Sequence, residues 1–281
     1  MKVAIQGELG SNSHMAAIEM LGDAIEIVPC TVSAEVFERV LDGSVDATVL
    51  PIENSLHGSV AEHYDLLLAH PVRILRESLL RIRFNLIAMP GVQLGDLRRV
   101  LSHPVALAQC RRFLTEHREL EAVPFYDTAG SVKHLMAAGL RDTAGIAPEI
   151  AATQYGGEIL LRGLEDHTQN FTRFHLIERT DRPGDGSSGD MSSVGDLACN
   201  KMSVAFSVEH RPGTLVAALQ VLADAGVDLT KIESRPVPGR PWEYVFYVDV
   251  RFDHFSRADA ALAVLREHCG MVKELGRYRA A

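Results

Sequence analysis

A hydroxyl, a carboxamide and a guanidinium lie close together in the segment Asn170-Phe171-Thr172-Arg173-Phe174. The alternation of a strand places Thr172 and Phe174 on one face and Phe171 and Arg173 on the other. One small hydroxyl therefore lies among apolar neighbours, with a guanidinium one residue away on the opposite face. An ordinary strand at the edge of the core is the alternative explanation. The segment also contains an N-glycosylation acceptor, which matters only in a secreted protein.

Two other segments combine polar residues with the ends of predicted strands. Glu53 and Asn54 directly follow a buried strand predicted over residues 47–50. Ligands of open α/β sheets bind at the carboxyl ends of parallel strands, so this loop is a candidate binding site. A solvated loop acid is the alternative for Glu53. Residues 6–13 form a glycine-containing loop between a strand and a helix, which resembles an anion cradle.

Repeated strand–loop–helix units position these residues. They predict an α/β domain over residues 1–178, with two lobes (about 1–78 with 155–178, and 79–154). This arrangement is similar to the periplasmic-binding-protein-like fold. Residues 179–200 are rich in glycine, serine and aspartate, which indicates a linker. The order βαββαβ over residues 201–281 predicts a ferredoxin-like module.

The length, composition and net charge of the chain argue against several classes of function. A length of 281 residues favours about two domains, and 47% hydrophobic residues suffice for a core. The net charge of −9 argues against nucleic acid and anionic membranes as partners. No signal peptide, membrane helix or metal-ligand cluster is evident. The four cysteines are scattered and form no C-x-x-C pair, which is typical of a reduced cytoplasmic protein.

Taken together, the motifs resemble prephenate dehydratase followed by an ACT regulatory domain. The motifs that carry this resemblance are Gly10-Ser11-Asn12-Ser13-His14, Pro51-Ile52-Glu53-Asn54-Ser55, Ser102-His103-Pro104, Gln109-Cys110, Asp127-Thr128-Ala129-Gly130-Ser131, Ala147-Pro148, Tyr155-Gly156 and the Thr172 segment. In the last module the motifs are Arg211-Pro212-Gly213-Thr214-Leu215 and Lys231-Ile232-Glu233-Ser234-Arg235-Pro236. Asn12 and Glu8 depart from the residues usual in this family, so the role of the first loop stays open, and Thr214 is a small departure in the regulatory loop.

The resemblance implies a monofunctional enzyme that converts prephenate to phenylpyruvate in phenylalanine biosynthesis, with no cofactor and no metal. Thr172 is the implied catalytic residue. It either protonates the leaving hydroxyl or only hydrogen-bonds to it. The implied substrate-binding residues are Ser13, Glu53, Asn54, Ser102, Gln109, Asp127, Thr128, Ser131, Asn170 and Phe174. Among these, we expect Glu53 and Asp127 to orient donors, because like charges repel a dianion.

The resemblance also implies feedback inhibition by L-phenylalanine and a homo-dimer or homo-tetramer. The implied allosteric residues lie in two loops: Gly213, Thr214, Leu215 and Val216, and Glu233, Ser234, Arg235 and Pro236. Free N–H groups at a helix start suit the ligand's carboxylate. Two alternatives remain. One is an arogenate dehydratase, whose substrate has an ammonium in place of the keto group, and the other is a non-enzymatic amino-acid sensor.

Overall fold

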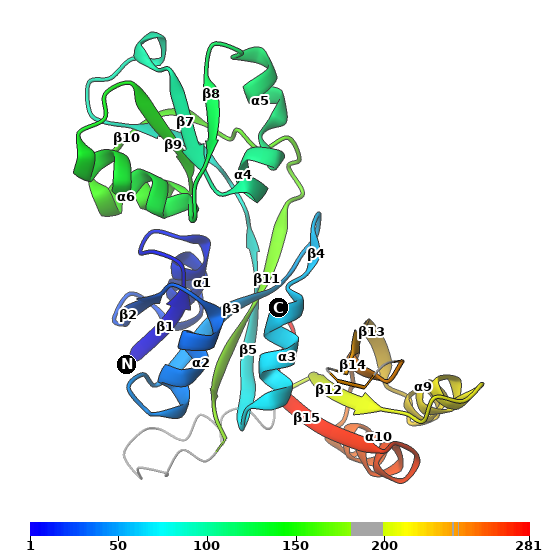
Figure 1. Cartoon of the computed structure of the whole chain (residues 1–281). Helices are drawn as coiled ribbons and strands as arrows, with labels where there is room; N and C mark the ends of the chain where they lie inside the picture. Colours follow the sequence, from blue (N-terminus) through cyan, green and yellow to red (C-terminus); the bar gives the residue numbers. More distant parts are fainter. Residues whose placement is uncertain (181–198, 238, 241) are drawn as a thin grey trace. The chain divides into compact units, whose positions relative to one another are not determined.

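The computed structural model (Figure 1) describes residues 1–180, 199–237, 239–240 and 242–281. Most of the predicted linker, residues 179–200, lies outside the described residues. The chain forms two compact units: Met1–Ser59 with Leu79–Phe174, and Val60–Ser78 with His175–Ala281. Two long strands, β5 (Val72–Arg81) and β11 (Phe171–Arg179), contribute residues to both units.

The first unit contains a mixed sheet with the strand order β2-β1-β3-β11-β5. Its strands β11 and β5 are the two that also contribute residues to the second unit. Its N-terminal strands are β1 (Lys2–Gln6), β2 (Glu26–Cys30), β3 (Ala47–Asn54) and the short β4 (Gly58–Ser59), which pairs with β3. Strand β1 pairs in parallel with both β2 and β3, and its apolar run is fully buried. Helices α1 (Asn12–Leu21) and α2 (Ser33–Leu41) contact these strands. The carboxyl ends of β1 and β3 therefore meet at one edge of the sheet.

A second sheet, with the strand order β10-β6-β9-β7-β8, completes the first unit. Its strands are β6 (Asn85–Ala88), β7 (Arg99–Ser102), β8 (Glu121–Pro124), β9 (Thr143–Ala147) and β10 (Glu158–Arg162). The helical elements of this part are η1 (Leu94–Asp96), α4 (Pro104–Gln109), α5 (Arg111–Glu116), α6 (Thr128–Ala138) and α7 (Glu149–Tyr155). Strand β10 pairs with β6, so the chain returns to the first sheet only at β11, later than the expected residue 155.

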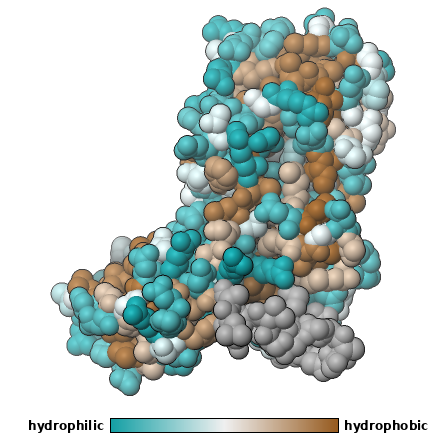
Figure 2. All heavy atoms as spheres, turned by 180° about the vertical axis from the view of Figure 1, so that it is seen from behind, coloured by the Kyte–Doolittle hydropathy of each residue, from teal (hydrophilic) through white to brown (hydrophobic). Residues whose placement is uncertain are grey.

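The second unit contains α3 (Ala61–Ala69) and a four-stranded antiparallel sheet with the order β13-β14-β12-β15. The C-terminal elements are β12 (Lys201–Ser207), α9 (Thr214–Asp224), β13 (Asp228–Pro236), β14 (Tyr244–Arg251), α10 (Phe255–His268) and β15 (Met271–Tyr278). They confirm the predicted βαββαβ order. Met202, Val204 and Phe206 alternate into a core shared with both helices. Figure 2 shows polar and apolar residues interspersed on the face of the molecule in view.

Helix α3 and strand β15 are tied together within the second unit. The Lys273 ammonium donates to the carbonyl oxygens of Leu67, Leu68 and His70 at 2.6–2.9 Å. A cation at the C-terminal end of a helix is favourable, because the last carbonyl groups have no partner within the helix. Arg235 on β13 adds a bidentate ion pair to Asp65 of α3, with N–O distances of 2.7 and 3.2 Å.

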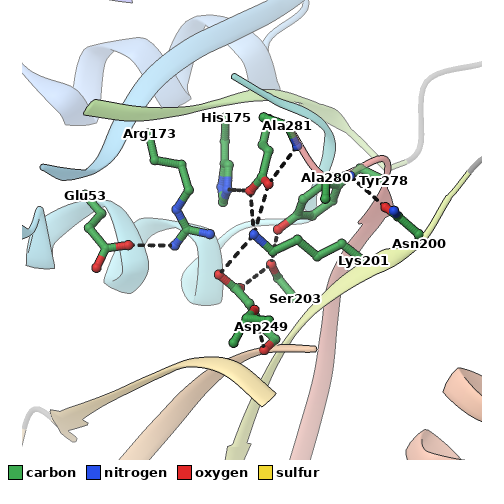
Figure 3. Close-up of polar contacts among 12 residues, drawn as sticks. Glu53, Arg173, His175, Asn200, Lys201, Ser203, Asp249, Tyr278, Ala280 and Ala281 are labelled. Atoms are coloured by element: carbon green, nitrogen blue, oxygen red, sulfur yellow. Dashed lines mark hydrogen bonds and ion pairs between the residues drawn. The ribbon is translucent and has the colours of Figure 1, made fainter. Parts of the chain in front are cut away.

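A buried polar cluster, defined by Glu77, His175, Lys201, Ser203 and Asp249, lies within the same unit (Figure 3). Lys201 Nζ donates to both Glu77 carboxylate oxygens at 2.8 and 3.0 Å, and Ser203 Oγ donates to Asp249 at 2.6 Å. Burial alone would raise the pKa of Glu77, but hydrogen bonds from His175 and Lys201 hold that pKa well below its usual range. Glu77 is therefore an ionised partner of a buried ammonium.

Candidate functional site

A pocket of about 470 Å³ in the first unit receives residues from both of its sheets. The residues that line it are Gln6, Gly7, Glu8, Ser11, Asn12, Ser13, Pro29, Cys30, Thr31, Pro51, His103, Tyr126, Asp127, Thr128, Lys133, Thr172 and Phe174. Residues in the first turns of α1 and α6 are among them. Helix N-termini favour anions, so this pocket suits a negatively charged molecule.

Thr172 lies on β11 at the wall of this pocket, with 8% of its surface exposed. A chain of carboxamides leads away from its hydroxyl. Asn54 Nδ2 lies 2.9 Å from Thr172 Oγ1 and 2.8 Å from Asn170 Oδ1. Asn170 Nδ2 in turn lies 2.9 Å from Gln109 Oε1, and Gln109 Nε2 lies 2.9 Å from His57 Nδ1. We call these four residues, His57, Gln109, Asn170 and Asn54, the amide chain.

Backbone donors determine how Asn54 is oriented. Its Oδ1 accepts from the backbone N–H groups of Leu56 at 3.0 Å and His57 at 3.1 Å. The amino group of Asn54 must therefore face Thr172, and Thr172 Oγ1 accepts that hydrogen bond. A hydroxyl that accepts one bond keeps its own proton for another acceptor. The arrangement thus prepares Thr172 to donate a hydrogen bond into the pocket.

The other expected substrate-binding residues fall into two groups. Ser13, Asp127, Thr128 and Phe174 line the pocket together with Thr172. The remaining six, Glu53, Asn54, Ser102, Gln109, Ser131 and Asn170, are not among the lining residues. Ser102 Oγ donates to the Ile146 carbonyl oxygen and Ser131 Oγ to that of Thr128, both at 2.6 Å.

The two expected acids each contact a donor of the protein. Glu53 forms an ion pair with Arg173 at 3.2 Å (Figure 3). Asp127 is the N-cap of α6, and its Oδ1 accepts from the Gly130 N–H at 2.7 Å. Burial raises the pKa of the Asp127 carboxyl above its usual value, although the hydrogen bond from the Gly130 N–H opposes this effect.

The pocket also contains a contact between the two sheets of the first unit that the motifs did not indicate. Glu8 accepts from the Tyr126 hydroxyl at 2.7 Å and from the Lys133 ammonium at 2.8 Å. Burial raises the pKa of Glu8, but the hydrogen bonds from Lys133 and Tyr126 outweigh it, and the pKa is lowered overall. Lys133 lies two residues after the Asp127–Ser131 motif, and this proximity is the only signal that pointed toward it.

The motifs also contain His14, His103 and Cys110, and the two histidines accept hydrogen bonds from backbone N–H groups. His14 Nδ1 accepts from the Gly10 N–H at 2.9 Å, and His103 Nδ1 accepts from the Val105 N–H at 3.3 Å. Burial raises the pKa of the Cys110 thiol well above its usual range. Cys110 is therefore a neutral thiol at physiological pH rather than a nucleophile.

A smaller pocket, of about 160 Å³, lies in the second unit. Its lining consists of Val208, Glu209, His210, Arg211, Gly213, Thr214, Leu215, Val216, Trp242, Tyr244 and Phe246. All four residues of the first expected allosteric loop, Gly213 to Val216, are included. The second loop, Glu233, Ser234, Arg235 and Pro236, lies on β13 and is not part of this lining. Trp242, with 73% of its surface exposed, was not expected in the site.

Two features are absent from the part of the chain that the structure describes. Among those residues, no group of three or more histidine, cysteine, aspartate or glutamate side chains has a metal-binding arrangement. None of the helices described is long and apolar enough to cross a bilayer.

Residues 3–182 match the family model of prephenate dehydratase. The chain belongs to the prephenate dehydratase family. Residues 202–265 match the ACT domain model, so the family's catalytic region is followed here by an ACT domain. Membership in this family makes the chain a dehydratase, and it confirms the fold expected from the sequence.

Three relatives illustrate the similarity. Arogenate dehydratase/prephenate dehydratase 2 of Arabidopsis thaliana is 40% identical over 289 residues, which cover 99% of this chain and 72% of the relative. A prephenate dehydratase from Arthrobacter aurescens, solved in complex with L-Phe, is 32% identical. It superposes with a TM-score of 0.86 and covers 100% of this chain and 90% of its own. A structure described as GqqA, a novel type of quorum quenching acylase, has the same identity and TM-score and covers 100% and 98%.

Proposed function

We propose that this prephenate dehydratase converts prephenate to phenylpyruvate, with Thr172 as the donor to the departing ring hydroxyl. The observation that carries this proposal is the orientation of Asn54, whose amino group lies 2.9 Å from Thr172 Oγ1 and leaves the threonine proton for the pocket. A donor that hydrogen-bonds to the leaving oxygen while negative charge develops on it lowers the activation barrier. General acid catalysis of this kind raises the reaction rate ~10²–10⁴-fold.

The reaction balances with the groups that this pocket offers. The bond between the ring and its carboxylate breaks and releases carbon dioxide, and the electron pair enters the ring. The carbon–oxygen bond para to it breaks, and the hydroxyl leaves as water after it gains a proton. The ring becomes aromatic, which supplies the driving force. This chemistry needs no oxidant, reductant or covalent nucleophile.

Prephenate is a dianion, so the pocket must bind two carboxylates. Lys133 and the first turns of α1 and α6, with Ser13 and Thr128, are our candidates for these contacts. Glu53 would act through the Arg173 guanidinium, and Asp127 through the α6 backbone that it caps. Asn54, Gln109 and Asn170 would act by orienting Thr172 rather than by touching substrate.

Arogenate is the second candidate substrate, because one residue of the pocket favours an ammonium. Glu8 places a carboxylate there, held by Tyr126 and Lys133, and such a group can pair with the amino group of arogenate. The Arabidopsis relative carries both substrates in its name. Prephenate remains our first choice, since Lys133 already neutralises Glu8.

One relative is described as an acylase. The surroundings of the Thr172 hydroxyl suit such an activity less well than they suit a dehydratase. Nucleophilic threonine requires a base that removes its proton. The nearest polar partner of Thr172 Oγ1 is the Asn54 amino group, at 2.9 Å, which is a donor and not a base. The geometry therefore favours a threonine that gives a hydrogen bond over one that attacks a carbonyl carbon.

Product analysis tests the proposed function. Full-length protein is incubated separately with prephenate and with arogenate, in buffer containing a strong chelator, and phenylpyruvate and phenylalanine are quantified by mass spectrometry. We expect phenylpyruvate from prephenate at a rate that the chelator does not change. Conversion of arogenate alone would replace the substrate in our proposal. Failure to turn over either compound would contradict the proposed function.

We further propose that L-phenylalanine binds the ACT module and inhibits the enzyme, which acts as a homo-dimer or homo-tetramer. Gly213 supports this site, because it is the N-cap of α9 with φ 87° and lines the second-unit pocket. The Arthrobacter relative was solved with L-Phe. A ligand inhibits only if it binds one arrangement of the enzyme better than the other.

A Gly213→Leu variant is expected to require roughly 10-fold more phenylalanine for half-inhibition, with kcat nearly unchanged. Gly213 lines the pocket, and its left-handed backbone disfavours any side chain at this position. Gly163→Leu is the matched control, since Gly163 has a similar φ of 68° and lies in the first unit. Equal phenylalanine sensitivity in Gly213→Leu and wild type would place the inhibitor elsewhere.

A further inference from the structure

We propose that His57 is a positioning residue: its imidazole, with a lone pair on Nδ1 and the proton on Nε2, accepts from the last amide of the chain and thereby holds the amide side chains in place beside Thr172. The proposal rests on the role of Thr172 given above. His57 is exposed and follows β3 by three residues, and nothing in the motifs assigned it a role.

The direction of each hydrogen bond in the amide chain follows from its Asn54 end. The two backbone N–H groups that bind Asn54 Oδ1 oblige its amino group to face Asn170 Oδ1. The amino group of Asn170 then faces Gln109 Oε1, which leaves the Gln109 amino group for His57. An amino group is a donor only, so His57 Nδ1 has to accept.

A proton on Nδ1 cannot be accommodated by turning the amides. If Gln109 turned its oxygen toward His57, its amino group would face the amino group of Asn170. If Asn170 turned as well, the same conflict would move to Asn54. Asn54 cannot turn, because its amino group would then face two backbone N–H groups. One pair of donors would always face each other, and an unsatisfied donor in a buried site is costly.

Burial makes the conflict expensive. Gln109 is 5% exposed and Asn170 is 1% exposed, so water has little access to a donor left without its acceptor. His57 Nδ1 also lies 3.4 Å from Asn54 Oδ1, but the 2.9 Å contact with Gln109 is the shorter of the two. That Asn54 oxygen already accepts two backbone hydrogen bonds, so it needs no third donor from the imidazole.

The side chain of asparagine gives a stringent test of this role. Its Oδ1 occupies about the position of histidine Nδ1, whereas the amide of glutamine reaches the position of Nε2. His57→Asn should therefore retain most of kcat. His57→Leu and His57→Gln should lower kcat by roughly 10-fold, with a smaller change in KM, because Gln109 loses its acceptor. A purely structural role for the imidazole would not distinguish asparagine from glutamine.

His167→Leu is the matched control, since His167 is also an exposed histidine of the first unit and belongs neither to the pocket lining nor to the amide chain. It should have wild-type kcat. Equal kcat values in His57→Leu and wild type would overturn the proposal, as would equal losses in His57→Asn and His57→Leu. Nitrogen NMR of labelled wild-type protein supplies an independent reading: the proton is expected on Nε2, and a proton on Nδ1 overturns the proposal. Absence of turnover in the wild type would instead contradict the proposed function, and the NMR result would still decide the tautomer.

Discussion

Replacement of Thr172 by valine is expected to lower kcat for prephenate by roughly 10²-fold or more, with KM and the melting temperature nearly unchanged. Valine keeps the shape of the side chain and removes only the hydroxyl. The donor to the leaving oxygen is then lost, while the residues that bind the carboxylates remain. Steady-state kinetics with phenylpyruvate as the measured product gives both constants, and thermal unfolding checks the fold.

Two further variants separate this effect from general damage. Thr172→Ser retains a hydroxyl and should keep part of the activity. Thr48→Val removes a buried threonine hydroxyl from β3 of the same sheet, where Thr48 Oγ1 donates to the Ala4 carbonyl oxygen at 2.9 Å. It should lower stability and spare kcat. A Thr172→Val enzyme within threefold of wild type would remove Thr172 from the mechanism.

Replacement of Lys201 by methionine is expected to cost about 3–5 kcal/mol of unfolding free energy. The Lys201 side chain is 7% exposed and that of Glu77 is 2% exposed, so the variant leaves a buried carboxylate without its ammonium. Denaturant unfolding followed by circular dichroism measures the loss. Lys2→Met is the control, because Lys2 pairs with Glu26 on the surface, where such ion pairs contribute ~0–1 kcal/mol. Equal stability of the two variants would contradict the account of the buried polar cluster.

The same pair has an expected pH dependence. The folded-state pKa of Glu77 lies below its ordinary value of 4.5. The stability that the ionised carboxylate contributes is therefore present above pH 4.5, and it is lost as the pH falls from there through the folded-state pKa. The difference in stability between wild type and Lys201→Met should therefore narrow as the pH decreases below about 4.5. A difference that stays constant down to the acid unfolding of the wild type would show that the Glu77 charge is not involved.

Local patterns in the sequence were sufficient for most elements of the fold. The alternation of Met202, Val204 and Phe206 marks β12, and the apolar run after Lys2 marks β1. Helix starts were less certain. Ser33 and Ser256 are of a residue type common at N-caps, yet they lie inside α2 and α10, whose N-caps are Val32 and His254. A serine is favourable both at a cap and in the first turn, so sequence alone does not separate the two positions.

Pairing between distant strands was the part of the fold that local patterns could not supply. β10 is short, with an apolar centre between Glu158 and Arg162, and this pattern is compatible with either sheet of the first unit. Its pairing with β6, about 70 residues earlier in the chain, depends on tertiary packing rather than on local propensity.

The candidate site was predictable as a set of residues but not as an arrangement. The motifs pointed to Asn54, Gln109 and Asn170, and the resemblance implied contacts with substrate. In the structure these side chains bind one another across separations of 61 and 116 residues. No spacing rule reports such hydrogen bonds, because they arise where loops of two sheets meet. For the same reason neither His57 nor the contact between Glu8 and Lys133 was expected.

A single-turnover experiment tests the central claim most directly, namely that Thr172 acts in the chemical step and not in binding. Excess wild-type enzyme or Thr172→Val enzyme is mixed with prephenate in a rapid-quench instrument, and phenylpyruvate is followed over time at several enzyme concentrations. We expect both proteins to saturate at similar enzyme concentrations, with the limiting rate of the variant lower by roughly 10²-fold. An unchanged limiting rate, with saturation shifted to much higher enzyme concentration, would show that Thr172 binds substrate and does not assist its reaction.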